Sequence, residues 1–336
     1  MSEDHHSVWG MEKEYEFLDY YQDDCDHTFN RRTKILHYLN RVVSYQVVNN
    51  KIIFQCLTNQ NEELKVLIEI CSPYVFRLIM SARNEMIDRK TIMVIKQDWA
   101  KTRFNVSEDD NSVKIETKGL TIEISKAPWR IFVKNNGKEI TKEGMVYWPS
   151  TECASYWPHR ETCPLGFSVN KTSGEIRVFE SFSIYPDEHF FGLGEKFTTL
   201  DKRGREVVSW NVDTGASTTT DRAYKNIPFF ISTRGYGIFI NSSFKIKYQM
   251  GSYSEAAYSF ELYDNLMDYY FILGPEFDKI IERYTDITGR SPVPPLWSFG
   301  TWMSHLTKEP DPHASDNAKS IEAFAKKYER RKYPAM

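Results

Sequence analysis

The chain has 336 residues, of which 41% are hydrophobic and 26% charged, and this composition is typical of a globular protein with one large or two ordinary domains. A formal net charge of -3 and short basic clusters argue against a nucleic-acid partner, and no stretch approaches the roughly 20 apolar residues that cross a bilayer. Residues 1–26 lack the apolar run of a secretory signal, so we expect no membrane partner and a cytoplasmic location.

The five cysteines indicate neither a disulfide framework nor a metal site. Their number is odd and they form no C-x-x-C pair, so we expect small core residues, and no metal or organic cofactor. They are Cys25, Cys56, Cys71, Cys153 and Cys163.

A polar lead-in over residues 1–34 precedes a long region with the pattern of a β-protein. Fourteen or so short apolar or alternating runs follow one another without a helix, which predicts a large antiparallel sandwich over residues 35–274, because parallel strands would need helical crossovers. Asn136-Gly137 predicts a hairpin turn within this region. The runs are 42–48, 51–57, 64–70, 74–80, 91–95, 112–117, 120–125, 129–134, 175–184, 227–232, 236–241, 244–250, 258–263 and 269–273.

The pattern changes after Gly274. Apolar residues at 277, 280, 281, 284 and 287 repeat with a helical period between Pro275 and Gly289, which predicts a helix over 275–288. A proline-rich connector then leads to an aromatic run at 296–303, read as a buried strand, and to a last helix that Ser315 caps. We interpret residues 275–336 as a linker helix and the first β/α unit of an incomplete barrel.

Several ordered motifs in the second half of the chain resemble one family. They read F-F-G-L-G-E-K-F at 190–197, W-N-V-D-T-G at 210–215, A-Y-K-N-I-P-F-F at 223–230, R-G-Y-G at 234–237 and W-S-F-G at 297–300. In this order they resemble the amino-terminal portion of glycoside hydrolase family 31, the retaining α-glycosidases, and look closest to its α-xylosidase branch. The resemblance covers about residues 180–302.

The resemblance implies a galactose-mutarotase-like β-sandwich followed by a (β/α)8 barrel. Retaining glycosidases use two carboxyl groups about 5 Å apart, and in this family both are aspartates on later barrel strands. Neither matching motif occurs in the sequence. We therefore expect the amino-terminal part of an α-xylosidase or α-glucosidase, without catalytic residues of its own and inactive alone.

Three residues are candidates for contact with an oligosaccharide or α-glycoside substrate. In the family, the aspartate that matches Asp213 reaches sugar hydroxyls, whereas the residue pattern alone would favour an Asx turn before Thr214-Gly215. Trp302 and His305 would lie near the carboxyl end of the first barrel strand, the functional face of such barrels. The segment 302–307 departs from the α-xylosidase pattern, which carries a further aromatic residue, so the choice of sugar stays open.

Two other functions compete with the glycosidase. One is a non-catalytic carbohydrate-binding sandwich, and the other is an aldose epimerase, for which the sequence shows no paired His and Glu motif to carry the proton transfers. Oligomerisation stays open.

Overall fold

The computed structural model describes residues 28–29, 31, 33–85, 88–96, 98–144, 162–212, 223–300, 322 and 326, and these residues are mainly β-strand. The chain divides into two compact units, residues 1–289 and 290–336. The strands are β1 (Lys34–Val48), β2 (Lys51–Thr58), β3 (Glu63–Ser72), β4 (Val75–Ser81), β5 (Asn105–Glu108), β6 (Ser112–Glu116), β7 (Thr121–Lys126), β8 (Trp129–Asn135), β9 (Lys138–Lys142), β10 (Gly166–Asn170), β11 (Ile176–Ser183), β12 (Phe190–Gly192), β13 (Arg205–Ser209), β14 (Phe229–Ser232), β15 (Tyr236–Ile240), β16 (Ile246–Ser254), β17 (Ala257–Leu262) and β18 (Leu266–Leu273). Two helical segments follow, α2 (Phe277–Thr288) and the 3-10 turn η1 (Leu296–Phe299).

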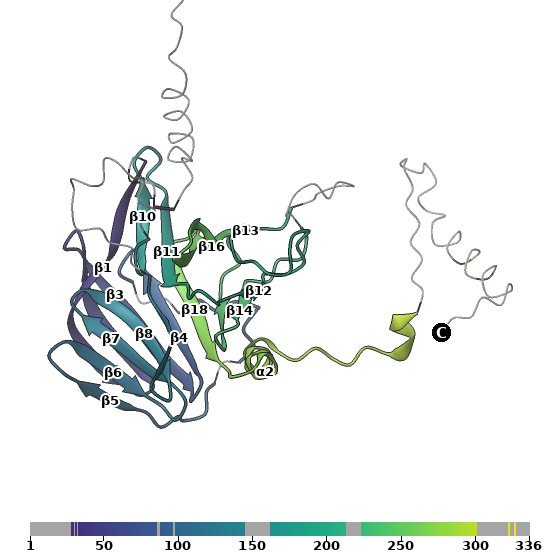
Figure 1. Cartoon of the computed structure of the whole chain (residues 1–336), viewed down its shortest axis with the longest axis horizontal. Coiled ribbons are helices and arrows are strands. Elements are labelled where there is room, and N and C mark those ends of the chain that lie inside the picture. Colours follow the sequence, from purple (N-terminus) through teal and green to yellow (C-terminus); the bar gives the residue numbers. More distant parts are fainter. Residues whose placement is uncertain are drawn as a thin grey trace, which may run out of the picture. The chain divides into compact units, whose positions relative to one another are not determined.

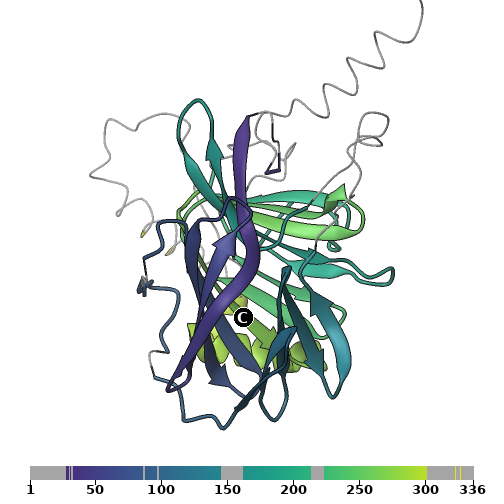
Figure 2. The ribbon, with the colours of Figure 1, turned by 90° about the vertical axis from the view of Figure 1, so that its left-hand side faces the viewer.

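The large sheet has 13 strands in the order β12-β14-β15-β18-β4-β3-β2-β1-β10-β11-β17-β16-β13. β1 joins its two halves, because residues Lys34 to Tyr38 pair with β10 and residues Leu39 to Val48 pair with β2 (Figures 1 and 2). Register shifts at Leu39/Arg41 and Val42/Ser44 mark the change of partner, and such bulges bend and twist a strand. The antiparallel sandwich predicted from the sequence is confirmed.

Aromatic side chains from the two halves of this sheet meet in its core. Tyr269 on β18 contacts Phe182 on β11 and Phe260 on β17 edge-to-face, with ring centroids 6.4 and 5.8 Å apart. Edge-to-face pairs add about 0.5–1.5 kcal/mol each to the area that they bury. The high aromatic content is therefore used largely as core.

A five-stranded sheet, β5-β6-β7-β8-β9, packs against the large one. Its Trp129 is fully buried and meets Phe54 of β2 edge-to-face at 5.8 Å. The predicted hairpin joins β8 to β9, and the positive φ angles of Asn136 (50°) and Gly137 (77°) fit a type I′ turn.

Buried carboxyl groups stand where the two sheets meet. Glu143, which follows β9, forms a bridge with Phe182 of β11 and accepts hydrogen bonds from Trp129 Nε1 (3.2 Å) and from the backbone of Ile131 and Leu165. Burial raises the pKa of Glu143 to about 7, and burial together with the charge of Glu143 raises the pKa of the neighbouring Glu180. Both carboxyls favour the protonated form in the folded state.

The predicted helix is confirmed as α2. Ile280 and Ile287 are fully buried against the sheet, and the Tyr284 ring stacks on Phe229 of β14 at 4.0 Å. The helix ends at Thr288, and the following Gly289, which has a φ of 101°, donates its N–H to the carbonyl of Thr285.

Two of the predicted strands are wrong. Residues 91–95 form a loop with a turn, in which Ile92 and Ile95 are exposed, because their apolar side chains are not taken up by a neighbouring strand. Leu296 begins the 3-10 turn η1 instead of a buried strand, and Leu296, Trp297 and Phe299 are all exposed. No barrel strand occurs in residues 290–300, and the last helix lies outside the described residues except at positions 322 and 326, which are helical.

The prediction for the cysteines is confirmed where it can be followed. Cys56, Cys71 and Cys163 are buried free thiols, and Cys25 and Cys153 lie outside the described residues. Burial raises the pKa of Cys56 and of Cys71, so both thiols stay protonated.

Neighbouring isoleucines in α2 allow a matched test of its packing. Ile280→Ala should lower the free energy of unfolding by about 2–5 kcal/mol, because a fully buried side chain is lost. Ile281→Ala, at a position that is 47% exposed, should cost about 0.5 kcal/mol or less. Urea unfolding of both variants measures the difference, and equal losses would show that α2 does not pack as described.

The buried carboxyl pair predicts a dependence of stability on pH. A raised carboxyl pKa means that the folded state binds more protons than the unfolded state, so stability is highest below the unfolded pKa of about 4.3 and falls as pH rises through about 7. The loss is about 1.4 kcal/mol for each pH unit by which the pKa is raised.

The measurement is the free energy of unfolding between pH 5 and pH 8. Glu143→Gln should make the free energy of unfolding depend less steeply on pH, because it removes the buried carboxyl. Glu116→Gln, at an exposed strand end, should leave this dependence unchanged. An unchanged slope in Glu143→Gln would contradict the assignment.

Candidate substrate-binding loop and a second pocket

The turn after β12 has a backbone that demands glycine. Gly192, Leu193 and Gly194 have φ angles of 124°, 66° and 86°. A Cβ at Gly194 would lie 2.1 Å from the carbonyl oxygen of Lys225, which also accepts the N–H of Glu195 at 2.9 Å. The G-L-G motif thus lets this turn lie directly against the segment 223–227.

Asn226 ties this turn to the chain on either side of the candidate loop. Its Nδ2 donates to Asn211 Oδ1 at 2.6 Å and to the carbonyl of Ala223 at 3.1 Å, and its Oδ1 accepts from Lys196 Nζ. Lys196 Nζ also donates to the carbonyl of Val208 at 2.7 Å. These bonds hold together three segments that are far apart in the sequence.

The same hydrogen bonds fix both ends of the loop that carries Asp213. Asn211 and Ala223 form an isolated parallel bridge, and the N–H of Val212 donates to the carbonyl of Ala223 at 3.3 Å. Asp213 itself lies outside the described residues, as do Trp302 and His305. The structure therefore brings the flanks of the predicted site together and leaves the roles of these three residues as predictions.

Exposed aromatic side chains surround the base of this loop. Trp210, Tyr224 and Phe197 are 50%, 56% and 61% exposed. Large aromatic rings left in contact with solvent in one region are typical of binding surfaces. Trp210 belongs to the W-N-V-D-T-G motif, and half of its surface is accessible.

The part that Asn226 plays was not predicted from the sequence. An asparagine before the apolar run of 227–231 reads as an ordinary turn residue, and its partners lie 15 and 30 residues away. An asparagine next to exposed Tyr224 and Lys225 in the motif was the available signal.

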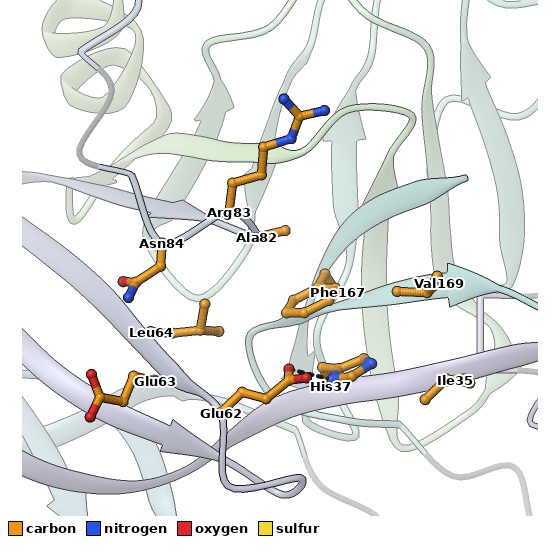
Figure 3. A pocket seen from close by; sticks show the side chains of 10 residues that line it. All are labelled: Ile35, His37, Glu62, Glu63, Leu64, Ala82, Arg83, Asn84, Phe167 and Val169. Carbon is orange, nitrogen blue, oxygen red and sulfur yellow. Dashed lines mark ion pairs between the residues drawn. The ribbon is translucent and has the colours of Figure 1, made fainter. Parts of the chain in front are cut away.

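The structure also forms a pairing that the sequence concealed. His37 Nδ1 lies 2.7 Å from Glu62 Oε2, in a pocket of about 470 Å³ lined by residues of β1, β3 and β10 (Figure 3). The two residues are 25 positions apart and meet because β2 returns antiparallel to β1.

The described residues contain no group of three side chains suited to hold a metal ion. Within the same residues, no helix is long and apolar enough to cross a bilayer.

Comparison with known proteins identifies the class of this fold. A family model described as the glycosyl hydrolase 31 N-terminal galactose mutarotase-like domain matches residues 65–248, more than half of the chain. The chain belongs to glycoside hydrolase family 31.

Similar proteins in this family act on α-glycosides. The chain is 42% identical over 144 residues to the α-xylosidase XylQ of Lactiplantibacillus pentosus, covering 43% of the chain and 19% of that protein. It is 27% identical over 253 residues to α-glucosidase 2 of Bacillus thermoamyloliquefaciens, covering 74% of the chain and 29% of that protein.

A solved structure has the same fold over most of the chain. The family 31 dextranase of Flavobacterium johnsoniae, complexed with glucose, is 30% identical with a TM-score of 0.65, and the match covers 78% of this chain and 30% of the dextranase. The chain thus spans less than a third of the length of these relatives.

Gly194 and Gly204 both have positive φ angles, and together they allow a matched test of the packing of the turn against Lys225. Gly194→Ala should destabilise the protein by more than about 2 kcal/mol, because the new Cβ meets the Lys225 carbonyl in addition to the strain of a positive φ. Gly204→Ala, with a φ of 74° and open space around it, should cost only the strain, about 1–2 kcal/mol. Thermal unfolding compares them, and a Gly194→Ala variant as stable as Gly204→Ala would mean that the turn does not lie against Lys225.

Proposed function

We propose that this chain is the amino-terminal part of a retaining α-glycosidase that hydrolyses O-glycosyl bonds of α-xylosides or α-glucosides. The observation that carries the proposal is the braced loop base, in which the family motifs at 190–197 and 223–230 hydrogen-bond to each other around the flanks of Asp213. A sandwich with a purely structural role would not need hydrogen bonds that fix both ends of this loop.

The catalytic carboxyl pair is proposed to come from a barrel outside this sequence. Glu143 and Glu180 are neighbours, yet both are completely buried and cannot reach a sugar. Asp109 is exposed but accepts the backbone N–H groups of Asn111 and Ser112, which lowers its pKa to about 2 and makes it a turn residue. We also propose that residues 35–274 form the sandwich, and that residues 275–336 form the linker helix and the start of the barrel.

Within this proposal Asp213 accepts hydrogen bonds from sugar hydroxyls. Bonds to a carboxylate are about twice as strong as neutral ones, so one residue of a neighbouring domain can orient a pyranose. Trp302 and His305 are proposed as further contacts at the mouth of the barrel. No cofactor is proposed, because carboxylate chemistry on glycosides needs none.

The nature of the relatives supports a xyloside over a glucoside. Two α-xylosidases are 42% and 38% identical over their matched segments and a third is 23% identical, whereas three α-glucosidases are 27%, 32% and 28% identical. The departure of residues 302–307 from the xylosidase pattern weighs against it, so both sugars belong in the assay. A cytoplasmic location is part of the same proposal, and cell fractionation tests it.

The alternative function is a carbohydrate-binding sandwich without catalysis. The intact mass of the native protein separates the two, because a mass more than twice 39.5 kDa supports the glycosidase and a mass of 39.5 kDa supports the binding protein.

The 336-residue chain should not turn over 4-nitrophenyl α-D-xyloside or α-D-glucoside above background, because its proposed catalytic aspartates lie elsewhere. Release of nitrophenol is the measurement, with Asp213→Ala as the matched variant. Hydrolysis by the chain that is lost in Asp213→Ala would place the active site within these residues and overturn the proposal.

A further inference from the structure

A polar pocket lies on strands that take no part in the candidate loop. It opens beside β1, β10 and the β2–β3 turn, and has a volume of about 470 Å³. Figure 3 shows Leu64 and Phe167 on opposite walls, the His37–Glu62 pair below and Arg83 at the upper rim. Pockets for small molecules hold about 300–1,000 Å³, so this one suits one or two sugar rings.

The imidazole of His37 is held in place by stacking, and its buried Nδ1 makes no hydrogen bond to the described residues. Its ring stacks on Phe167, with centroids 4.5 Å apart and an interplanar angle of 3°, and its Nδ1 faces Glu62. Its Nε2 has no hydrogen bond to any residue that the structure describes. A fixed ring with a free nitrogen is prepared to hydrogen-bond a ligand at little entropic cost.

The other polar side chains of the pocket have unused capacity as well. Glu62 is half exposed, and its Oε2 lies 2.7 Å from His37 Nδ1 without a hydrogen bond. The Oδ1 atom of Asn84 is buried and accepts no hydrogen bond from the described residues, although buried polar atoms are normally satisfied. Arg83 is exposed, and its guanidinium pairs with no carboxylate among those residues.

The mixture of groups selects the class of ligand. The carboxylates of Glu62 and Glu63 against the guanidinium of Arg83 leave one formal negative charge, so the pocket does not favour an anion. The Glu62 carboxylate and the buried Oδ1 of Asn84 can accept from hydroxyls, and the Arg83 guanidinium at the upper rim can donate to them. The apolar side chains of Leu64 and Val169 suit the C–H face of a sugar ring. We propose that this pocket binds a neutral carbohydrate at a site separate from the Asp213 loop. The proposal does not depend on the chain being part of a glycosidase.

The test is a titration of the whole 336-residue chain with D-glucose and with isomaltotriose. Saturation-transfer NMR and the chemical shifts of the backbone amides report binding. We expect dissociation constants of about 1–10 mM, with shifts at Glu62, Glu63, Arg83 and Asn84. Glu62→Gln and Arg83→Met should each weaken binding about tenfold, because each loses a charge-assisted hydrogen bond. The matched controls Glu116→Gln and Arg205→Met, at exposed strand positions, should bind as the unchanged chain does.

Asp213→Ala separates this proposal from the proposed function. Sugar binding that survives in Asp213→Ala and weakens in the pocket variants supports the second site, whatever the enzyme assay shows. Binding lost only in Asp213→Ala overturns it, as does an absence of amide shifts in the pocket or of any binding up to about 50 mM. The amide shifts need no variant, so a misfolded substitution would not leave the question open.

Discussion

The change of partner along β1 is the constraint on which the rest of the structure depends. This strand pairs with β10 at its beginning and with β2 at its end, and two register shifts bend it in between. The bend turns one continuous sheet into two facing halves, so that Tyr269 can contact Phe182 and Phe260 across the core. A straight β1 would leave both aromatic faces in water.

Burying so much sheet also buries polar groups, and some of these are paired in networks. Glu188 accepts hydrogen bonds from Ser232 and Tyr236, and Arg77 forms a two-pronged ion pair with Asp268 at 2.7 Å. Such pairs add little net stability, but the loss of one partner is costly because a buried charge is left alone. They therefore fix the register of the strands, whereas the aromatic core supplies the driving force.

The two candidate binding regions use this scaffold in different ways. The Asp213 loop is braced by glycines and by Asn226 at the end of the sheet, where exposed aromatic rings leave a surface for further protein or substrate. The pocket at His37 lies on the strand that joins the halves, and its geometry follows from the bend of β1. A rigid sheet thus supports one site through its loops and another through its strands.

The β-class, helix α2 and the hairpin at Asn136-Gly137 could be predicted from the sequence, because alternation, helical period and turn chemistry are local properties. The family followed from ordered motifs. The strand predictions failed at 91–95 and at 296–299, because an apolar run becomes a strand only beside a partner strand, and the whole fold determines which segments are neighbours. The contacts of Asn226 with Asn211 and Lys196, and of His37 with Glu62, arise from the tertiary structure. Contacts between residues 15 to 30 positions apart depend on strand register, which no single segment specifies.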